Sequence, residues 1–231
     1  MKRFYKSVSV AEVEGGFQVT LDTRAIKTAQ GRPQIAPTRA LAEALAREWE
    51  AQGDTIDAKS LPLRDMADYA IDVAARESEA MIAKLVAYAD TDTLLYRADP
   101  DEPLYTSQQE MWEPILTAFE ARFAITLKRV SGVMHTAPDE AAMATLRAHL
   151  QTLDPFALAA LEAMTSLAAS LTIGLSALEP EADLDALWDA ANLEEEWQAE
   201  QWGRDEEAEE RRAKRRADFQ RAGAFARLAS D

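Results

Sequence analysis

Three consecutive carboxylates, Glu194 to Glu196, are the side chains in this sequence most able to do chemistry. Paired carboxyl groups act as general acid and base in hydrolytic enzymes, so a small hydrolase using this cluster is one hypothesis. Adjacent carboxylates on one helix point in diverging directions, however, and no second catalytic site is recognisable in the sequence. We therefore predict no catalytic residue and keep the hydrolase as an alternative.

The same carboxylates lie in a stretch with a helical apolar pattern, LDALWDAANLEEEWQAEQWG, from Leu184 to Gly203. No proline or glycine interrupts it before Gly203, and Asp183 can cap its start, so we expect one helix. Spacings of four and three place on one helical face Leu184, Trp188, Ala191, Glu195, Gln198 and Trp202. The result is an apolar stripe with a carboxylate and an amide in its middle.

A carboxylate inside an apolar stripe needs a partner, because burying an unpaired charge is costly. Two interpretations of Glu195 stay open. In the first, Glu195 pairs within the fold with a basic residue such as Arg24 or Arg97. In the second, the stripe is an interaction surface and the partner is another protein.

Other site chemistries have little support in the sequence. His135 and His149 are isolated on separate elements, without further ligands at metal-binding spacing. The absence of cysteine excludes disulfides and thiol catalysis. No phosphate-binding glycine loop or dinucleotide fingerprint is found. We therefore expect no metal and no cofactor.

The charge balance narrows the class of partner. With 25 basic and 41 acidic residues the net charge is −16, which disfavours a nucleic-acid partner. An acidic run over 194–210 precedes a basic run over 211–221, with pairs such as Glu207 and Arg211 at helical spacing. This pattern predicts a solvated, self-compensating helix.

The sequence also bears on location and oligomeric state. No window approaches the roughly 18 to 20 apolar residues of a membrane span, so we expect no membrane insertion. The N-terminal MKRFYKSVSV lacks the apolar run of a secretion signal, and no targeting peptide is visible. A bacterial cytoplasmic location is expected. Nothing in the sequence demands a dimer, so we expect a monomer.

The elements that would position these residues follow from periodicity. Short strands over 3–36, with a turn at Gly15-Gly16, predict an antiparallel sheet, and a helix from Thr38 to about Gln52 would cover one of its faces. From residue 37 onward the pattern is helical and includes a long helix over 154–178. The predicted class is α+β, with a small N-terminal antiparallel sheet and covering helix (domain 1–58) followed by a larger all-helical domain (59–231).

An ordered series of motifs along the whole chain resembles one family. The matching segments, in chain order, are Arg3 to Lys6, Phe17 to Thr28, Glu48 to Gln52, Ala70 to Asp72, Tyr88 to Arg97, Gln108 to Pro114 and Leu193 to Gly203. The series resembles the assembly chaperone family of the ATP synthase catalytic sector, the alpha-subunit-binding chaperones of mitochondria and alphaproteobacteria.

The resemblance implies a molecular chaperone without catalysis. It implies binding to the free alpha subunit and shielding of its beta-facing surface until beta replaces the chaperone. A functional glutamate of the family's C-terminal signature corresponds to Glu194 or Glu195, and the stripe favours Glu195. The predicted partner-binding residues are Trp188, Glu194, Glu195, Gln198 and Trp202.

A third hypothesis is an acidic adaptor without a specific client. Its binding would collapse at moderate salt, because exposed charges are screened. Two other residues in the matching segments, Trp49 and Asp72, are interpreted as structural anchors of the small sheet and its helix.

Overall fold

The structure is a computed structural model that describes residues 1–132 and 136–230. It contains two compact units. The first comprises Met1 to Ser78, Asp154 to Ala160 and the chain from Ala224 onward; the second comprises the described residues of 79–153 and 161–223. The domain boundary at residue 58 stays a prediction.

The first unit contains a small antiparallel sheet with β2 at its centre. The strands are β1 (Val8–Val13), β2 (Gly16–Leu21), β3 (Arg24–Ala25) and β4 (Ile35–Ala36). β1 and β2 form a hairpin in register Val8 with Leu21, and β3 and β4 both pair with β2. The turn predicted at Gly15-Gly16 is confirmed: both glycines have positive φ, a conformation that side-chain-bearing residues rarely adopt.

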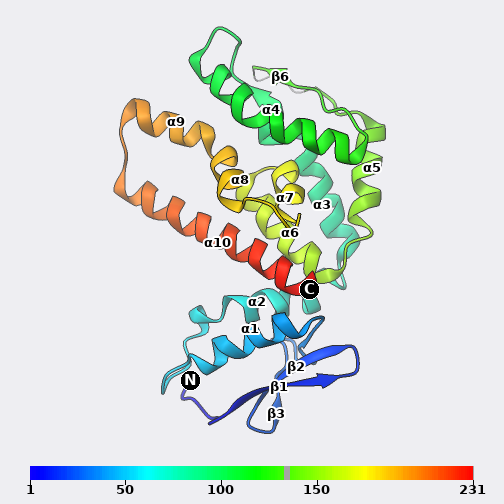
Figure 1. Ribbon diagram of the computed structural model, residues 1–231, viewed down its shortest axis with the longest axis vertical. Helices are drawn as coiled ribbons and strands as arrows, with labels where there is room; N and C mark the ends of the chain where they lie inside the picture. Colours follow the sequence, from blue (N-terminus) through cyan, green and yellow to red (C-terminus); the bar gives the residue numbers. More distant parts are fainter. Residues whose placement is uncertain (133–135, 231) are drawn as a thin grey trace. The chain divides into compact units, whose positions relative to one another are not determined.

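Helices form most of the remaining described chain and are drawn in sequence colours in Figure 1. They are α1 (Arg39–Glu50), η1 (Ala58–Ser60), α2 (Pro62–Tyr69), η2 (Ala70–Ala74), α3 (Ser78–Asp90), η3 (Thr93–Leu95), α4 (Pro103–Phe123), α5 (Glu140–Leu150), α6 (Pro155–Ala168), α7 (Leu171–Ala177), α8 (Leu184–Ala191), α9 (Leu193–Trp202) and α10 (Glu206–Ser230). Two short strands, β5 (Tyr96–Arg97) and β6 (Val130–Ser131), pair in parallel within the second unit. The predicted α+β class is confirmed.

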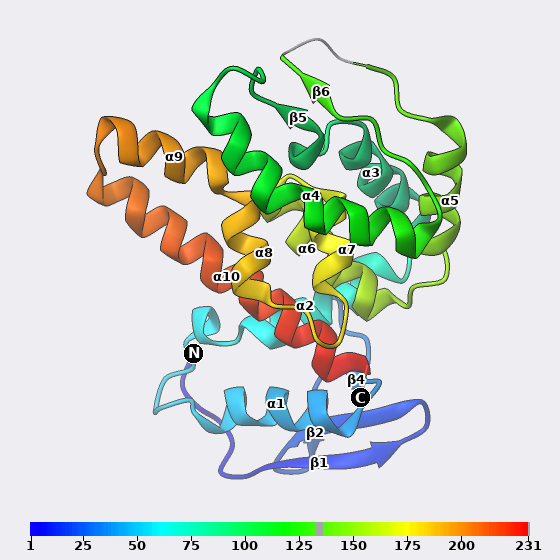
Figure 2. The ribbon, with the colours of Figure 1, turned by 45° about the horizontal axis from the view of Figure 1, so that its top comes forward.

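Helix α1 lies along the sheet, as Figure 2 shows. Thr38 caps it, because its Oγ1 accepts the Leu41 N–H at 3.1 Å. The Tyr5 hydroxyl donates to the Trp49 carbonyl at 2.6 Å, and the two rings meet edge to face with centroids 6.0 Å apart. The predicted covering helix is therefore present, and Trp49 is one of its anchors on the N-terminal segment.

Asp72, in the π-helical turn η2, fixes the loop between β3 and β4. Its buried carboxylate accepts hydrogen bonds from Thr28 Oγ1 at 2.9 Å and the Gln30 N–H at 3.1 Å, and pairs with Arg32 at 2.5 Å. Burial alone would raise the Asp72 pKa, but the hydrogen bonds from Thr28 and Arg32 outweigh it and lower the pKa. Asp72 thus makes the structural contacts expected of an anchor.

The single helix predicted over 154–178 is wrong. α6 ends at Ala168, Ala169 adopts a left-handed conformation with φ 49°, and Ser170 begins α7 by accepting the Ile173 N–H at 3.0 Å. The buried Asp92 carboxylate accepts the Thr172 N–H at 2.9 Å and so caps the same helix start. A serine cap and a carboxylate distant in sequence together stabilise this break.

Candidate functional site

The predicted helix from Leu184 to Gly203 is two helices, and the prediction of one is wrong. α8 ends at Ala191, and Asn192 leaves the helical conformation with φ −111° and ψ 14°. Its side-chain Nδ2 donates to the Trp188 carbonyl at 2.8 Å. The Asn192 N–H keeps its own bond to the same carbonyl at 3.1 Å, so backbone and side chain together close the end of α8 without proline or glycine.

The break divides the predicted stripe into an inner part on α8, which is buried at Trp188, and an outer part on α9, which is exposed at Trp202. Trp188, on α8, is 2% exposed and packs on Phe219 of α10 with ring centroids 5.5 Å apart. Trp202, at the end of α9, is 81% exposed. Within α9 alone, spacings of three and four still place Glu195, Gln198 and Trp202 on one face, and all three are exposed. We call these three residues the α9 face.

The chain reverses direction after Gly203, so that α9 and the first part of α10 run back along each other, as Figures 1 and 2 both show. Ion pairs hold the two helices together. Glu195 lies 3.4 Å from Arg212 and 3.9 Å from Arg215. Glu195 therefore has partners inside the fold, but they are α10 arginines and not the suggested Arg24 or Arg97.

Glu194 faces the other way, toward α4. Its Oε1 accepts a hydrogen bond from Gln108 Nε2 at 2.7 Å, while Gln108 Oε1 accepts the Ala98 N–H at 2.9 Å. Burial raises the Glu194 pKa, and the hydrogen bond from Gln108 offsets part of that rise. On the same side of α4, Trp112 Nε1 donates to the Ala190 carbonyl at 2.8 Å. These contacts fix α8 and the start of α9 on α4.

Gln108 is the positioning residue that sequence reasoning missed. It is fully buried, and its hydrogen bonds to Glu194 and Ala98 link α4 to the start of α9 and to the residue after β5. The signal was available in part, because Gln108 and Trp112 are four residues apart and must share a face of α4. Their common target, the α8–α9 junction, could not be inferred from that spacing.

Arg97 belongs to a separate network. Its buried guanidinium pairs with Glu113 at 2.8 Å, and Glu113 also pairs with Arg129 at 2.9 Å. Burial lowers the Arg97 pKa, although the Glu113 carboxylate opposes this effect. Arg97 thus stabilises the packing of β5 on α4.

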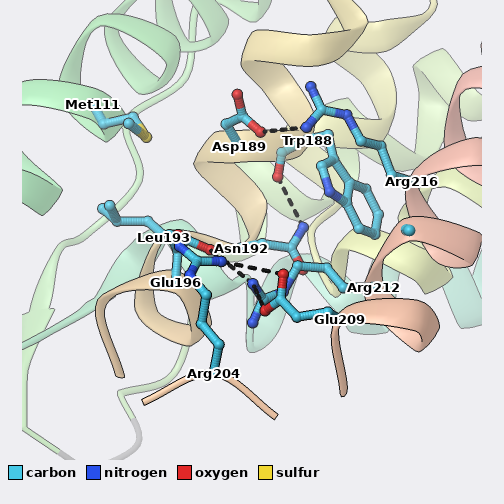
Figure 3. A pocket seen from close by; sticks show the side chains of 11 residues that line it. Met111, Trp188, Asp189, Asn192, Leu193, Glu196, Arg204, Glu209, Arg212 and Arg216 are labelled. Carbon is cyan, nitrogen blue, oxygen red and sulfur yellow. Dashed lines mark hydrogen bonds and ion pairs between the residues drawn. The ribbon is translucent and has the colours of Figure 1, made fainter. Parts of the chain in front are cut away.

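A cavity of about 520 Å³ opens between α4, α8, α9 and α10, and Figure 3 shows its lining. Its charged residues are Asp189, Glu196, Arg204, Glu209, Arg212 and Arg216. Arg212 lies between Glu196 at 2.7 Å and Glu209 at 3.0 Å, and Arg204 also pairs with both of these carboxylates. The charges in the cavity compensate one another, so it offers neither a net charge nor a free base to a ligand.

The carboxylate cluster lacks the arrangement that glycoside-type hydrolysis needs. Glu195 and Glu196 both pair with Arg212, while Glu194 is bound to Gln108. Two catalytic carboxyl groups must instead face each other across a substrate. In this arrangement the cluster orders α9 on its neighbours.

Of the two histidines, His149 lies among the described residues. His149 packs edge-on against Phe123 with ring centroids 4.9 Å apart, and its burial together with the nearby Arg122 charge lowers its pKa. His135 lies outside the described residues. Across residues 1–132 and 136–230, no three His, Asp or Glu side chains are grouped so as to hold a metal ion.

Comparison with known proteins defines the class. The family described as "ATP12 chaperone protein" matches residues 2–120. Atp12 from Paracoccus denitrificans is 38% identical, with a TM-score of 0.95 over 99% of this chain and 98% of its own. A mutant of the same protein gives the same identity and TM-score, over 99% and 97%. The Atu1473 protein from Agrobacterium tumefaciens is 38% identical, with a TM-score of 0.92 over 100% of this chain and 86% of its own.

The chain is therefore a chaperone by class, and it belongs to the ATP12 chaperone family. The resemblance to the assembly chaperones of the ATP synthase catalytic sector is confirmed. Among the described residues, no helix is long and apolar enough to cross a membrane.

Proposed function

We propose that this chaperone binds the free alpha subunit of the ATP synthase catalytic sector and covers its beta-facing surface until beta replaces it. The observation that carries the proposal is the α9 face, where an 81% exposed tryptophan stands on a helix rich in carboxylates. Tryptophan is enriched at protein–protein interfaces and among the residues that contribute most to binding.

The five predicted partner-binding residues divide into two roles in this proposal. Glu195, Gln198 and Trp202 contact the client directly, because they are exposed on one face. Trp188 and Glu194 position that face: Trp188 packs on Phe219 of α10, and Glu194 is bound to Gln108 of α4. The arginine pairs of Glu195 are themselves partly exposed, so an incoming basic group can compete for this carboxylate.

The setting in the cell is part of the same proposal. We place a monomeric, non-catalytic chaperone in the bacterial cytoplasm, since the compared solved structures come from bacterial species. The net charge of −16 supports solubility of a complex with an exposed subunit and disfavours nucleic acid as a partner.

The experiment is capture of the co-expressed alpha subunit by the tagged chaperone, with Glu195→Lys as the test variant. Reversing this charge should reduce the recovered alpha subunit about tenfold, equivalent to roughly 1.4 kcal/mol. The melting temperature should change little, because the Glu195 side chain is 44% exposed, such ion pairs contribute only about 0–1 kcal/mol, and Arg212 keeps its pairs with Glu196 and Glu209.

Glu200→Lys is the matched control. Glu200 is an exposed glutamate of α9 five positions along, and therefore away from the α9 face. Equal losses in both variants would favour an acidic adaptor that responds to net charge. Unfolding of Glu195→Lys would show that the residue is structural and would contradict its assignment to the client surface.

A further inference from the structure

A second surface of the same unit forms a cavity of about 570 Å³ between α4, the end of α7 and the start of α8. This volume lies within the roughly 300–1,000 Å³ typical of ligand pockets. Its apolar lining comes from Pro114, Ile115, Ala118, Phe119, Ala186 and Leu187. We call this cavity the α4–α8 groove.

The groove is open because of the residue sizes along its walls. Pro114 and Ala118, one turn apart on α4, and Ala186 on α8 are exposed and small. Phe119 and Leu187 are buried and close its floor. Small exposed residues above a buried apolar floor leave room for the side chains of a partner.

The rim of the groove is acidic. Glu179, Glu181 and Asp183 line it beside one base, Arg122, which already pairs with Glu179. The Asp183 carboxylate accepts the first N–H groups of α8, from Asp185 and Ala186, both at 3.0 Å. The Glu181 carboxylate is exposed, and no residue within 1–132 and 136–230 forms a hydrogen bond or ion pair with it. Glu181 is therefore available to a cation.

We propose that the α4–α8 groove binds a segment of the free alpha subunit in which apolar side chains stand next to a lysine or arginine. The apolar side chains fill the groove and the basic group pairs with Glu181. This inference rests on the proposed function and adds a second client contact to the α9 face. Since α8 spans only about 12 Å, one client surface can reach from the groove toward α9.

Charge complementarity selects this occupant over the alternatives. A second copy of the chain would bring its own net charge of −16 to an acidic rim, and nucleic acid would be repelled by the same rim. A purely apolar segment would gain nothing from Glu181. A segment with both apolar and basic groups matches both features.

The absence of cysteine permits a direct test. Ala118→Cys introduces one thiol into the groove and Glu12→Cys introduces one on the exposed β1 strand as the control. Maleimide alkylation of each thiol is timed in the free chaperone and in its complex with co-expressed alpha subunit. Occupation of the groove should slow alkylation of the thiol at position 118 about tenfold or more. The alkylation rate of the control thiol at position 12 should stay unchanged.

A charge variant tests the basic group. Glu181→Lys should reduce capture of the alpha subunit about fivefold or more, whereas Glu12→Lys, an equivalent change on β1, should leave capture unchanged. The exposed position of Glu181 predicts normal folding, which circular dichroism checks for both variants.

The outcomes separate the two proposals. If the alpha subunit is captured but the thiol at position 118 reacts at its free rate, the groove inference is overturned and the proposed function stands. Protection at position 118 without the alpha subunit, rising with chaperone concentration, would identify a second copy as the occupant and also overturn it. If the wild-type chain captures no alpha subunit, both proposals fail.

Discussion

Two adjacent glutamates show how a single position changes the role of a side chain. Glu194 points toward α4 and is partly buried against Gln108, whereas Glu195 points toward α10 and is half exposed beside two arginines. The sequence leaves the choice between them open. Because Glu194 is bound to Gln108 of α4 and Glu195 is exposed, we propose that Glu195 is the one that meets the client.

The pKa of Glu194 leads to a pH-dependent prediction. Burial raises this pKa in the folded state, so the ionised form lowers stability at neutral pH, and this cost disappears as the pH falls through the raised pKa toward the unfolded value. Glu194→Gln keeps an oxygen that can accept the Gln108 hydrogen bond and carries no charge. The variant should be more stable than wild type at pH 7, with the difference shrinking as the pH falls through the raised pKa toward the unfolded value.

Urea unfolding at a series of pH values measures this difference. Glu195→Gln is the control, because removing its half-exposed ion pairs should leave stability unchanged or slightly lower at pH 7. A Glu194→Gln variant that is less stable than wild type at every pH would refute the burial argument.

Among the elements, those with contiguous signals were predictable. The β1–β2 hairpin follows from alternation around Gly15-Gly16, and α1 follows from Thr38 and an apolar helical pattern. The charged helix also follows, and its predicted pair of Glu207 and Arg211 is present at 2.7 Å. In each case the information lies within a few residues of the element.

The two helix breaks were not predictable, because they depend on contacts between residues that lie far apart in the sequence. Ser170 and Thr172 start α7 with help from Asp92, which lies far away in the sequence. Asn192 breaks the α8–α9 stretch while α4 holds the residues on either side of it through Gln108 and Trp112. Tertiary contacts overrode a local pattern that favoured continuous helix in both cases, and the division of the candidate site into inner and outer parts depends on the second break.

Asn192→Ala tests the importance of that break. Alanine has the highest helix propensity, so we expect α8 and α9 to merge and Glu195 to move away from Arg212. Helix content by circular dichroism should stay the same or rise slightly, while capture of the alpha subunit falls about fivefold or more. Gln201→Ala, an exposed change on α9, is the control. Unchanged capture despite a merged helix would show that the orientation of α9 is irrelevant.

At the scale of the whole molecule, the two anchors of the small sheet and the two proposed client contacts belong to different units. The anchors Trp49 and Asp72 belong to the first unit, while the α9 face and the α4–α8 groove both belong to the second. Both proposed contacts combine apolar surface with carboxylates. Salt should weaken such contacts without abolishing them, because screening acts on the charges and not on apolar burial.

Capture of client from cells at low and at moderate salt is the decisive test of the proposed function. The tagged chaperone should recover the ATP synthase alpha subunit without beta at both salt concentrations, and added beta should release it. Recovery of alpha and beta together, or of a mixed set of proteins that is lost at moderate salt, would contradict a specific chaperone of the free alpha subunit.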